Sequence, residues 1–119
     1  MEKPTIIITG GAGFIGSHTC VELIDFYNLV VVDNLVNSNK NVIGKIKEIT
    51  QRDNITFYET NMLDIVSLNE IFRKHNPIGV IHFAGLKAVG ESVKNPCYYY
   101  QNNLISTLNL LETMEKHSC

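Results

Sequence analysis

The chain has 119 residues, of which 45% are hydrophobic and 18% are charged, and its formal net charge is -2 at pH 7. This is the composition of an ordinary globular protein, and the length suits one small domain rather than two. The sequence has no cluster of basic residues, so nothing in it indicates binding to nucleic acid. Its longest apolar runs are too short to span a membrane.

Apolar runs alternate with helical patterns along the whole chain. Strands are expected at four runs rich in Ile and Val, namely Thr5–Ile8, Leu29–Val32, Ile55–Tyr58 and Ile78–His82. Each run is almost continuously apolar or aromatic, which is typical of strands that are covered on both faces. Strands separated by helices favour a parallel sheet with right-handed crossovers, and the doubly wound rule predicts the strand order 3-2-1-4.

Four helices are expected, because apolar residues recur at helical spacing after each strand. Their predicted buried faces are Cys20, Leu23, Ile24 and Tyr27; Val42, Ile46 and Ile49; Ile65, Leu68 and Phe72; and Leu104, Thr107, Leu108, Leu111 and Met114. The fold class is therefore α/β, an incomplete Rossmann-type doubly wound parallel sheet of about four strands. Since this order leaves the fourth strand at an edge, we expect residues 1–119 to be the first part of a larger domain.

The first predicted strand runs into three glycines spaced three residues apart, Gly10, Gly13 and Gly16, and then into a helix. A turn of this kind brings backbone close to a pyrophosphate, and the helix N-terminus offers free N–H groups and the positive end of its dipole. The strand before it and the helix after it favour a dinucleotide site. The alternative is a tight strand-to-helix turn that binds no ligand.

An acidic residue, Asp33, ends the second predicted strand. A carboxylate at this place would accept hydrogen bonds from both ribose hydroxyls and repel a 2′-phosphate, which favours NAD over NADP. The alternative is a helix N-cap or a solvated turn residue. After the third strand, Asn61 and Met62 could take the adenine amino group and cover its ring, although such a pair would also suit an ordinary turn.

The fourth predicted strand ends in small residues that let backbone approach a ligand. Lys87 follows at the carboxyl edge of the sheet, where a cation could hold the pyrophosphate or a ribose, or could be a bare surface lysine. His82, within the apolar strand, is interpreted as a packed core histidine rather than a catalyst, and His18 as a structural residue of the first helical turn.

The three cysteines, Cys20, Cys97 and Cys119, are widely spaced and odd in number, which favours thiols in a reducing compartment over disulfides. No cluster of His, Cys and Asp has the spacing of metal ligands, so no metal is expected. The start of the chain carries no charged-then-apolar signal pattern. We therefore expect a cytoplasmic protein.

Four stretches together resemble the UDP-glucose 4-epimerases, which are extended short-chain dehydrogenases/reductases. They are Thr9–Thr19; Asp33–Leu35 with Asn37 and Ser38; His82–Ser92; and Tyr99 and Tyr100 with Asn102 and Asn103. The glycine motif identifies only the superfamily, whereas the run Gly85–Ser92 is much more specific to the epimerases. The resemblance covers nearly the whole chain but only about the first third of a family member, so the substrate domain is expected to lie outside it.

The resemblance implies NAD as the cofactor and a UDP-sugar as the substrate of the full-length protein, which would be a homodimer. The implied NAD contacts, beside the three glycines, are Phe14, Ile15, Asp33, Asn34, Leu35, Val36, Asn37, Ser38, Asn61, Met62, Phe83, Ala84, Gly85, Leu86, Lys87 and Asn103. In the family, a tyrosine removes the proton of the sugar 4-hydroxyl while NAD takes the hydride from C4 and later returns it to the other face. The family's Ser/Thr and Tyr-x-x-x-Lys have no counterpart here, so no catalytic residue is assigned in this chain.

Three positions depart from the family pattern. Asn61 stands where an aspartate is usual, and Ile105-Ser106 replace a common Asn-Gly, which should affect packing only. The segment Asp25–Asn28 is one residue shorter than usual and lacks the usual helix-ending glycine, so the family pattern does not predict how this turn closes. Two other functions remain: a different NAD-dependent sugar-nucleotide epimerase or dehydratase, and a catalytically inactive nucleotide-binding fragment.

Overall fold

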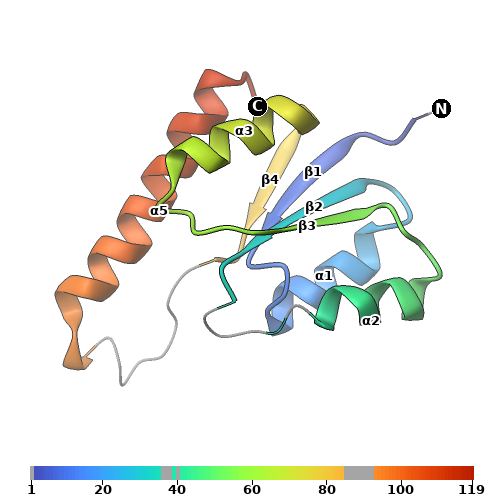
Figure 1. Cartoon of the computed structure of the whole chain (residues 1–119), viewed down its shortest axis with the longest axis horizontal. Coiled ribbons are helices and arrows are strands. Elements are labelled where there is room, and N and C mark those ends of the chain that lie inside the picture. Colours follow the sequence, from blue (N-terminus) through green and yellow to red (C-terminus); the bar gives the residue numbers. More distant parts are fainter. Residues whose placement is uncertain (1, 36–38, 40, 85–92) are drawn as a thin grey trace.

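Four strands and four helices alternate in the computed structural model, which describes residues 2–35, 39, 41–84 and 93–119 (Figure 1). The strands are β1 (Thr5–Thr9), β2 (Asn28–Asp33), β3 (Ile55–Glu59) and β4 (Gly79–His82). The helices are α1 (Phe14–Leu23), α2 (Asn41–Thr50), α3 (Ile65–His75) and α5 (Pro96–Lys116). Each strand lies within one residue of its predicted limits at either end, because the Ile- and Val-rich runs define them sharply.

The strands form one parallel sheet in the order β3-β2-β1-β4, which confirms the predicted order 3-2-1-4. At the centre of the sheet, Ile7 of β1 is in register with Val30 of β2 on one side and Val80 of β4 on the other. The helices α1 and α2 cover one face, while α3 and α5 cover the other (Figure 1). The carboxyl ends of all four strands therefore meet along one edge.

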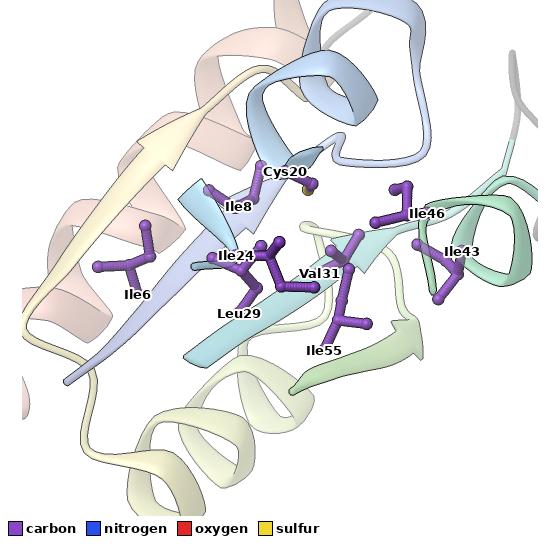
Figure 2. Close-up of a cluster of buried hydrophobic side chains, with 9 residues drawn as sticks. All are labelled: Ile6, Ile8, Cys20, Ile24, Leu29, Val31, Ile43, Ile46 and Ile55. Carbon is purple, nitrogen blue, oxygen red and sulfur yellow. The ribbon is translucent and has the colours of Figure 1, made fainter. Parts of the chain in front are cut away.

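Alternate residues of the central strands supply two separate hydrophobic clusters. The cluster on the α1 and α2 side is shown in Figure 2, and its buried members are Ile6, Ile8, Cys20, Ile24, Leu29, Val31, Ile43, Ile46 and Ile55. The cluster on the α3 and α5 side consists of Ile7, Val30, Val32, Met62, Leu68, Ile71, Phe72 and Leu110. Both faces of the sheet are thus covered, as the continuously apolar strands predict.

Two predicted helix faces are only partly right. On α2 the predicted Ile46 is buried and Val42 packs beside it, but Ile43 is also buried and Ile49 is exposed. On α5 the predicted Met114 packs against the core, but Leu104, Leu108 and Leu111 are exposed, and the fully buried residues are Ser106, Leu110 and Thr113. The buried hydroxyl of Thr113 donates to the carbonyl of Asn109 one turn earlier, at 2.7 Å. A polar residue that is satisfied within its own helix can face the core, and an apolar stripe does not reveal it.

The turn between α1 and β2 closes without a glycine. The amide of Asn54, just before β3, donates from Nδ2 to the carbonyls of Ile24 and Tyr27 at 2.8 and 2.9 Å. The carbonyl of the C-cap residue of α1 and one carbonyl of the turn before β2 are thereby satisfied by a side chain from another part of the chain. This contact explains how Asp25–Asn28 can omit the helix-ending glycine.

Asn54→Ala is expected to lower the free energy of unfolding by about 1–2 kcal/mol, because both carbonyls lose their donor in a partly buried place. Gln101→Ala, at an exposed position on α5, is the control and should change stability by less than about 0.5 kcal/mol. Urea denaturation followed by circular dichroism measures both variants. Equal stability of the two variants would show that the Asn54 contacts contribute nothing.

In the described part of the chain, no helix combines the length and the apolar character needed to cross a membrane. Among the same residues, no group of three or more His, Cys, Asp or Glu side chains is placed to hold a metal ion.

Candidate functional site

The glycine turn lies between the carboxyl ends of β1 and β4. Gly10 has a φ of +68°, and a Cβ there would lie 2.7 Å from the backbone nitrogen of Ala84. Its own N–H donates to the carbonyl of Val32 at 2.8 Å, which ties the turn to β2 as well. Only glycine fits both this backbone conformation and this close approach of two chain segments.

The other two predicted glycines differ in what surrounds them. A Cβ on Gly16 would overlap the carbonyl oxygen of Gly10 and lie 2.8 Å from the Cα of Gly11, so the fold itself requires glycine. A Cβ on Gly13 would meet only the carbonyl oxygen of Gly10, at 3.3 Å. The surrounding chain therefore scarcely excludes a side chain at Gly13, and close approach of a ligand is the better reason for a glycine there.

A fourth glycine, Gly11, was not singled out by the spacing rule. A Cβ at this position would lie 2.7 Å from Cγ1 of Val31, in the middle of the buried cluster beneath the turn. The adjacent pair Gly10-Gly11 is the sequence signal for this position. The requirement for glycine at position 11 comes from packing against Val31 and not from ligand binding.

Helix α1 begins directly after this glycine turn. Gly13 is the N-cap, it has no side chain to cap the helix, and the first turn contains no acidic residue. The first turn of the helix therefore contributes no side chain of its own that would cap its backbone N–H groups or neutralise the positive end of its dipole. Phe14 and Ile15, two predicted contacts, are 80% and 58% exposed at this end. The ring of His18 packs edge-on against that of Phe14, with centroids 4.7 Å apart, in keeping with a structural role for this histidine.

Asp33 lies at the carboxyl end of β2 with its carboxylate directed at the glycine turn. Its Oδ2 accepts a hydrogen bond from the backbone N–H of Ala12 at 3.1 Å, and its Oδ1 accepts one from Leu35 at 2.8 Å. The side chain is only 7% exposed, which excludes the solvated turn residue considered from the sequence. Each carboxylate oxygen can accept more than one hydrogen bond, which is the property that recognition of two ribose hydroxyls requires.

The loop after β2 begins with backbone strain. Leu35 has a φ of +62°, a conformation that costs free energy for a bulky side chain and is held here by its bond to Asp33. Asn34 is exposed beside it. Of the other predicted contacts in this loop, Val36, Asn37 and Ser38 lie outside the described residues.

Asn61 and Met62 follow β3 and have different environments. Asn61 is exposed, and its Oδ1 accepts from the backbone N–H of Leu63 at 2.9 Å, so it forms the turn considered as the alternative. One lone pair of that oxygen is used locally and a second one is left. Met62 is buried in the cluster on the α3 and α5 side. Little of its surface is left to cover a ring.

The end of β4 is tied to β1 by two hydrogen bonds. The N–H of Phe83 donates to the carbonyl of Thr9 at 2.9 Å, and the N–H of Ala84 donates to the hydroxyl of Thr9 at 3.2 Å. Gly85, Leu86 and Lys87 lie outside the described residues. Asn103, the last predicted contact, is on the first half of α5, where its carbonyl accepts from Thr107.

His82 makes more than packing contacts, so its interpretation as a packed core histidine is incomplete. It is half-buried, and both of its ring nitrogens lie within hydrogen-bond distance of threonine hydroxyls, on β1 and on α5. Its position between an apolar strand and small residues gave no sign of this, because Thr9 and Thr107 are 98 residues apart in the chain.

A family model described as GDP-mannose 4,6 dehydratase matches residues 7–119. The chain is 54% identical over 113 residues to a UDP-glucose 4-epimerase of Bacillus subtilis, and 48% identical over 119 residues to one of Schizosaccharomyces pombe. These alignments cover 94% and 99% of this chain and 33% of each relative. The chain thus spans about a third of the length of these curated relatives.

Solved structures agree. A UDP-glucose 4-epimerase from Bifidobacterium longum in complex with NAD+ and UDP superposes with a TM-score of 0.92 at 45% identity, covering 96% of this chain and 34% of that one. The epimerase from Stenotrophomonas maltophila, with bound NAD and formylated UDP-arabinopyranose, gives a TM-score of 0.91 at 37% identity. That match covers 97% of this chain and 34% of the other. The described fold is therefore that of the N-terminal third of such proteins.

Proposed function

The chain belongs to the GDP-mannose 4,6 dehydratase family, and we propose that residues 1–119 form the NAD-binding N-terminal part of a UDP-glucose 4-epimerase. The observation that carries this proposal is the contact between Asp33 and the backbone of Ala12. It sets an acceptor for ribose hydroxyls beside a helix N-terminus that suits a pyrophosphate. The substrate domain of the protein would lie outside these residues.

The residues of this chain fit two parts of the adenosine diphosphate half of a dinucleotide, namely its pyrophosphate and its ribose. The N–H groups at the start of α1 would donate to the pyrophosphate, with Gly13 allowing its close approach, and Asp33 would accept from the ribose. Phe14 and Ile15 are exposed beside this position. The remaining proposed contacts are Gly10, Gly16, Asn34, Leu35, Val36, Asn37, Ser38, Asn61, Met62, Phe83, Ala84, Gly85, Leu86, Lys87 and Asn103.

When bound, NAD would supply reversible hydride transfer at C4 of the sugar, so that the net reaction interconverts UDP-glucose and UDP-galactose. The contribution of this chain to that reaction is to bind and orient the dinucleotide. A tyrosine with a lysine four residues later does not occur anywhere in the 119 residues. The proton transfer at the sugar 4-hydroxyl is therefore proposed to depend on residues outside this sequence.

The first experiment is a calorimetric titration of the 119-residue chain with NAD, with conversion of UDP-galactose assayed on the same sample. We expect binding without conversion, since the adenosine half-site lies in these residues and the catalytic pair does not. NADP is the matched control ligand and should bind more weakly, because its 2′-phosphate would meet the Asp33 carboxylate. Conversion of UDP-galactose by the chain alone would contradict the proposal that the catalytic residues lie outside it. Absence of NAD binding would contradict the proposed dinucleotide site.

The relatives favour an epimerase over the dehydratase named by the family model. Eight curated relatives at 46–54% identity include seven called UDP-glucose 4-epimerases, and the other is a bifunctional protein of Pachysolen tannophilus. A dehydratase of the same family remains the second candidate, supported by the family description. Assaying the protein that contains the substrate domain with UDP-glucose and GDP-mannose distinguishes the two.

Two finer features are proposed for the longer protein. It would be a homodimer, which sedimentation equilibrium tests, and it would be cytoplasmic, which fractionation tests. Free cysteines support the second feature, since Cys20, Cys97 and Cys119 form no disulfide among the described residues. Burial raises the pKa of the Cys20 thiol to about 12, so this cysteine is a packing residue and not a reactive thiolate.

A further inference from the structure

His82 connects three elements at the carboxyl edge of the sheet. Its Nδ1 lies 2.5 Å from the hydroxyl oxygen of Thr9 at the end of β1, and its Nε2 lies 3.2 Å from the hydroxyl oxygen of Thr107 on α5. The Thr9 hydroxyl also accepts from the N–H of Ala84 at 3.2 Å. At the other end, the Thr107 hydroxyl donates to the carbonyl of Asn103 at 2.9 Å.

These contacts fix the direction of the hydrogen bond between His82 and Thr107. The carbonyl of Asn103 can only accept, so the single hydrogen of the Thr107 hydroxyl is used there, and Thr107 must accept from Nε2 of His82. A neutral imidazole with its hydrogen on Nε2 has an acceptor at Nδ1, and the Thr9 hydroxyl donates to it. The Thr9 oxygen is then free to accept from Ala84, as observed. One neutral tautomer of His82 satisfies all four contacts.

The first half of α5 is largely exposed. Tyr98, Tyr100 and Leu104 are all at least half exposed, and the fully buried residues described on this helix begin only at Ser106. The helix packs with α3 on the same face of the sheet, and its buried Leu110 and Thr113 belong to its second half. The bond between His82 and Thr107 thus ties the part of α5 nearest Asn103 to the sheet.

We propose that His82 is a positioning residue of the dinucleotide site, whose Nε2–H donates to Thr107 and thereby holds the first half of α5 against the ends of β1 and β4. The proposal rests on the proposed function, because the residues that this chain of bonds holds in place, Asn103 and Ala84, are proposed contacts of the dinucleotide. His82 touches neither substrate nor cofactor in this role. It acts through Thr9, directly before the glycine turn, and through Thr107, one helical turn after Asn103.

The tautomer is tested without any ligand. In a 15N-labelled sample of the chain at neutral pH, Nε2 of His82 should give the signal of a protonated ring nitrogen. His82→Gln identifies the signals by their loss. An unprotonated Nε2 would overturn the proposal, because the Thr107 hydroxyl already donates to the carbonyl of Asn103 and would have no hydrogen for the ring.

The positioning role is tested with a matched pair of variants, Thr107→Val and Thr107→Ser. Valine keeps the shape but removes the hydroxyl, and should weaken NAD binding about 3- to 10-fold, the range for one net hydrogen bond. Serine keeps the hydroxyl, and its affinity should stay within about twofold of the wild type. Calorimetry gives both dissociation constants, and thermal unfolding on the same samples reports stability.

Equal NAD affinity of the two variants would overturn the proposal, even if valine lowered the melting temperature, since a purely structural threonine would behave in that way. Failure of the wild type to bind NAD would instead reject the proposed function. In that case the tautomer of His82 and the exchange rate of the Ala84 amide decide the proposal. Exchange should be faster in Thr107→Val than in Thr107→Ser, and equal rates would overturn it.

Discussion

Gly13→Ala is expected to abolish most NAD binding and leave the fold intact, whereas Gly16→Ala is expected to unfold the chain. A Cβ at position 13 would meet one carbonyl oxygen at 3.3 Å, and its φ of -76° suits alanine. The folding cost should be about 1 kcal/mol, from a poorer N-cap. Because the methyl group would occupy the approach of the pyrophosphate, NAD affinity should fall at least about tenfold, or 1.4 kcal/mol.

At Gly16 two effects compete, and their sizes decide the outcome. Alanine within a helix is favoured over glycine by about 1 kcal/mol. The added methyl group would, however, overlap the Gly10 carbonyl and crowd the Cα of Gly11, which are backbone atoms held by β1, β2 and β4. Overpacking against atoms that cannot move aside costs about 3 kcal/mol or more. Steric overlap therefore wins.

Chemical denaturation and calorimetry on both glycine variants check these expectations, with Gly44→Ala as the control. A Cβ on Gly44, on α2, would meet nothing within 4 Å, so this variant should keep its NAD affinity and gain slightly in stability. Full NAD affinity in a folded Gly13→Ala protein would show that no ligand approaches this glycine. The turn would then be a purely structural one.

The sheet could be predicted from the sequence because its strands are unambiguous. The Ile- and Val-rich runs have no competing periodicity, and the doubly wound rule supplies their order. The helix faces were less predictable, since α5 is apolar on more than one side. Its buried side contains Ser106 and Thr113, and Thr113 is satisfied by a bond within its own helix. Burial here was decided by which side meets α3, which is a tertiary effect.

The glycine turn and Asp33 were also predictable, because the motif fixes backbone close to a strand end and the acidic residue ends the next strand. The roles of Asn54 and His82 were not. Asn54 caps a helix end almost thirty residues earlier in the chain, and His82 joins threonines from the first strand and the last helix. Such contacts arise only after the elements have packed, so no local spacing of residues in the sequence predicts them.

Asp33→Asn is expected to weaken NAD binding by about 1–3 kcal/mol, the cost of losing hydrogen bonds to a charged acceptor. The variant also disturbs the protein itself, since both carboxylate oxygens accept backbone N–H groups, from Ala12 and Leu35. An asparagine amide presents one acceptor and one donor group, so one of these two N–H groups would face a donor. A loss of NAD affinity alone would therefore not separate binding from a distorted turn.

The ratio of NADP to NAD affinity makes that separation. If the Asp33 carboxylate faces the ribose, removing its charge takes away the repulsion of a 2′-phosphate, so NADP should lose much less affinity than NAD, or gain some. A distorted turn would weaken both ligands equally, because they share the pyrophosphate and the rest of the adenosine. Calorimetry with both ligands on wild type and Asp33→Asn measures the ratio. An unchanged ratio of NADP to NAD affinity would mean that this carboxylate only stabilises the loop, and that other residues recognise the ribose.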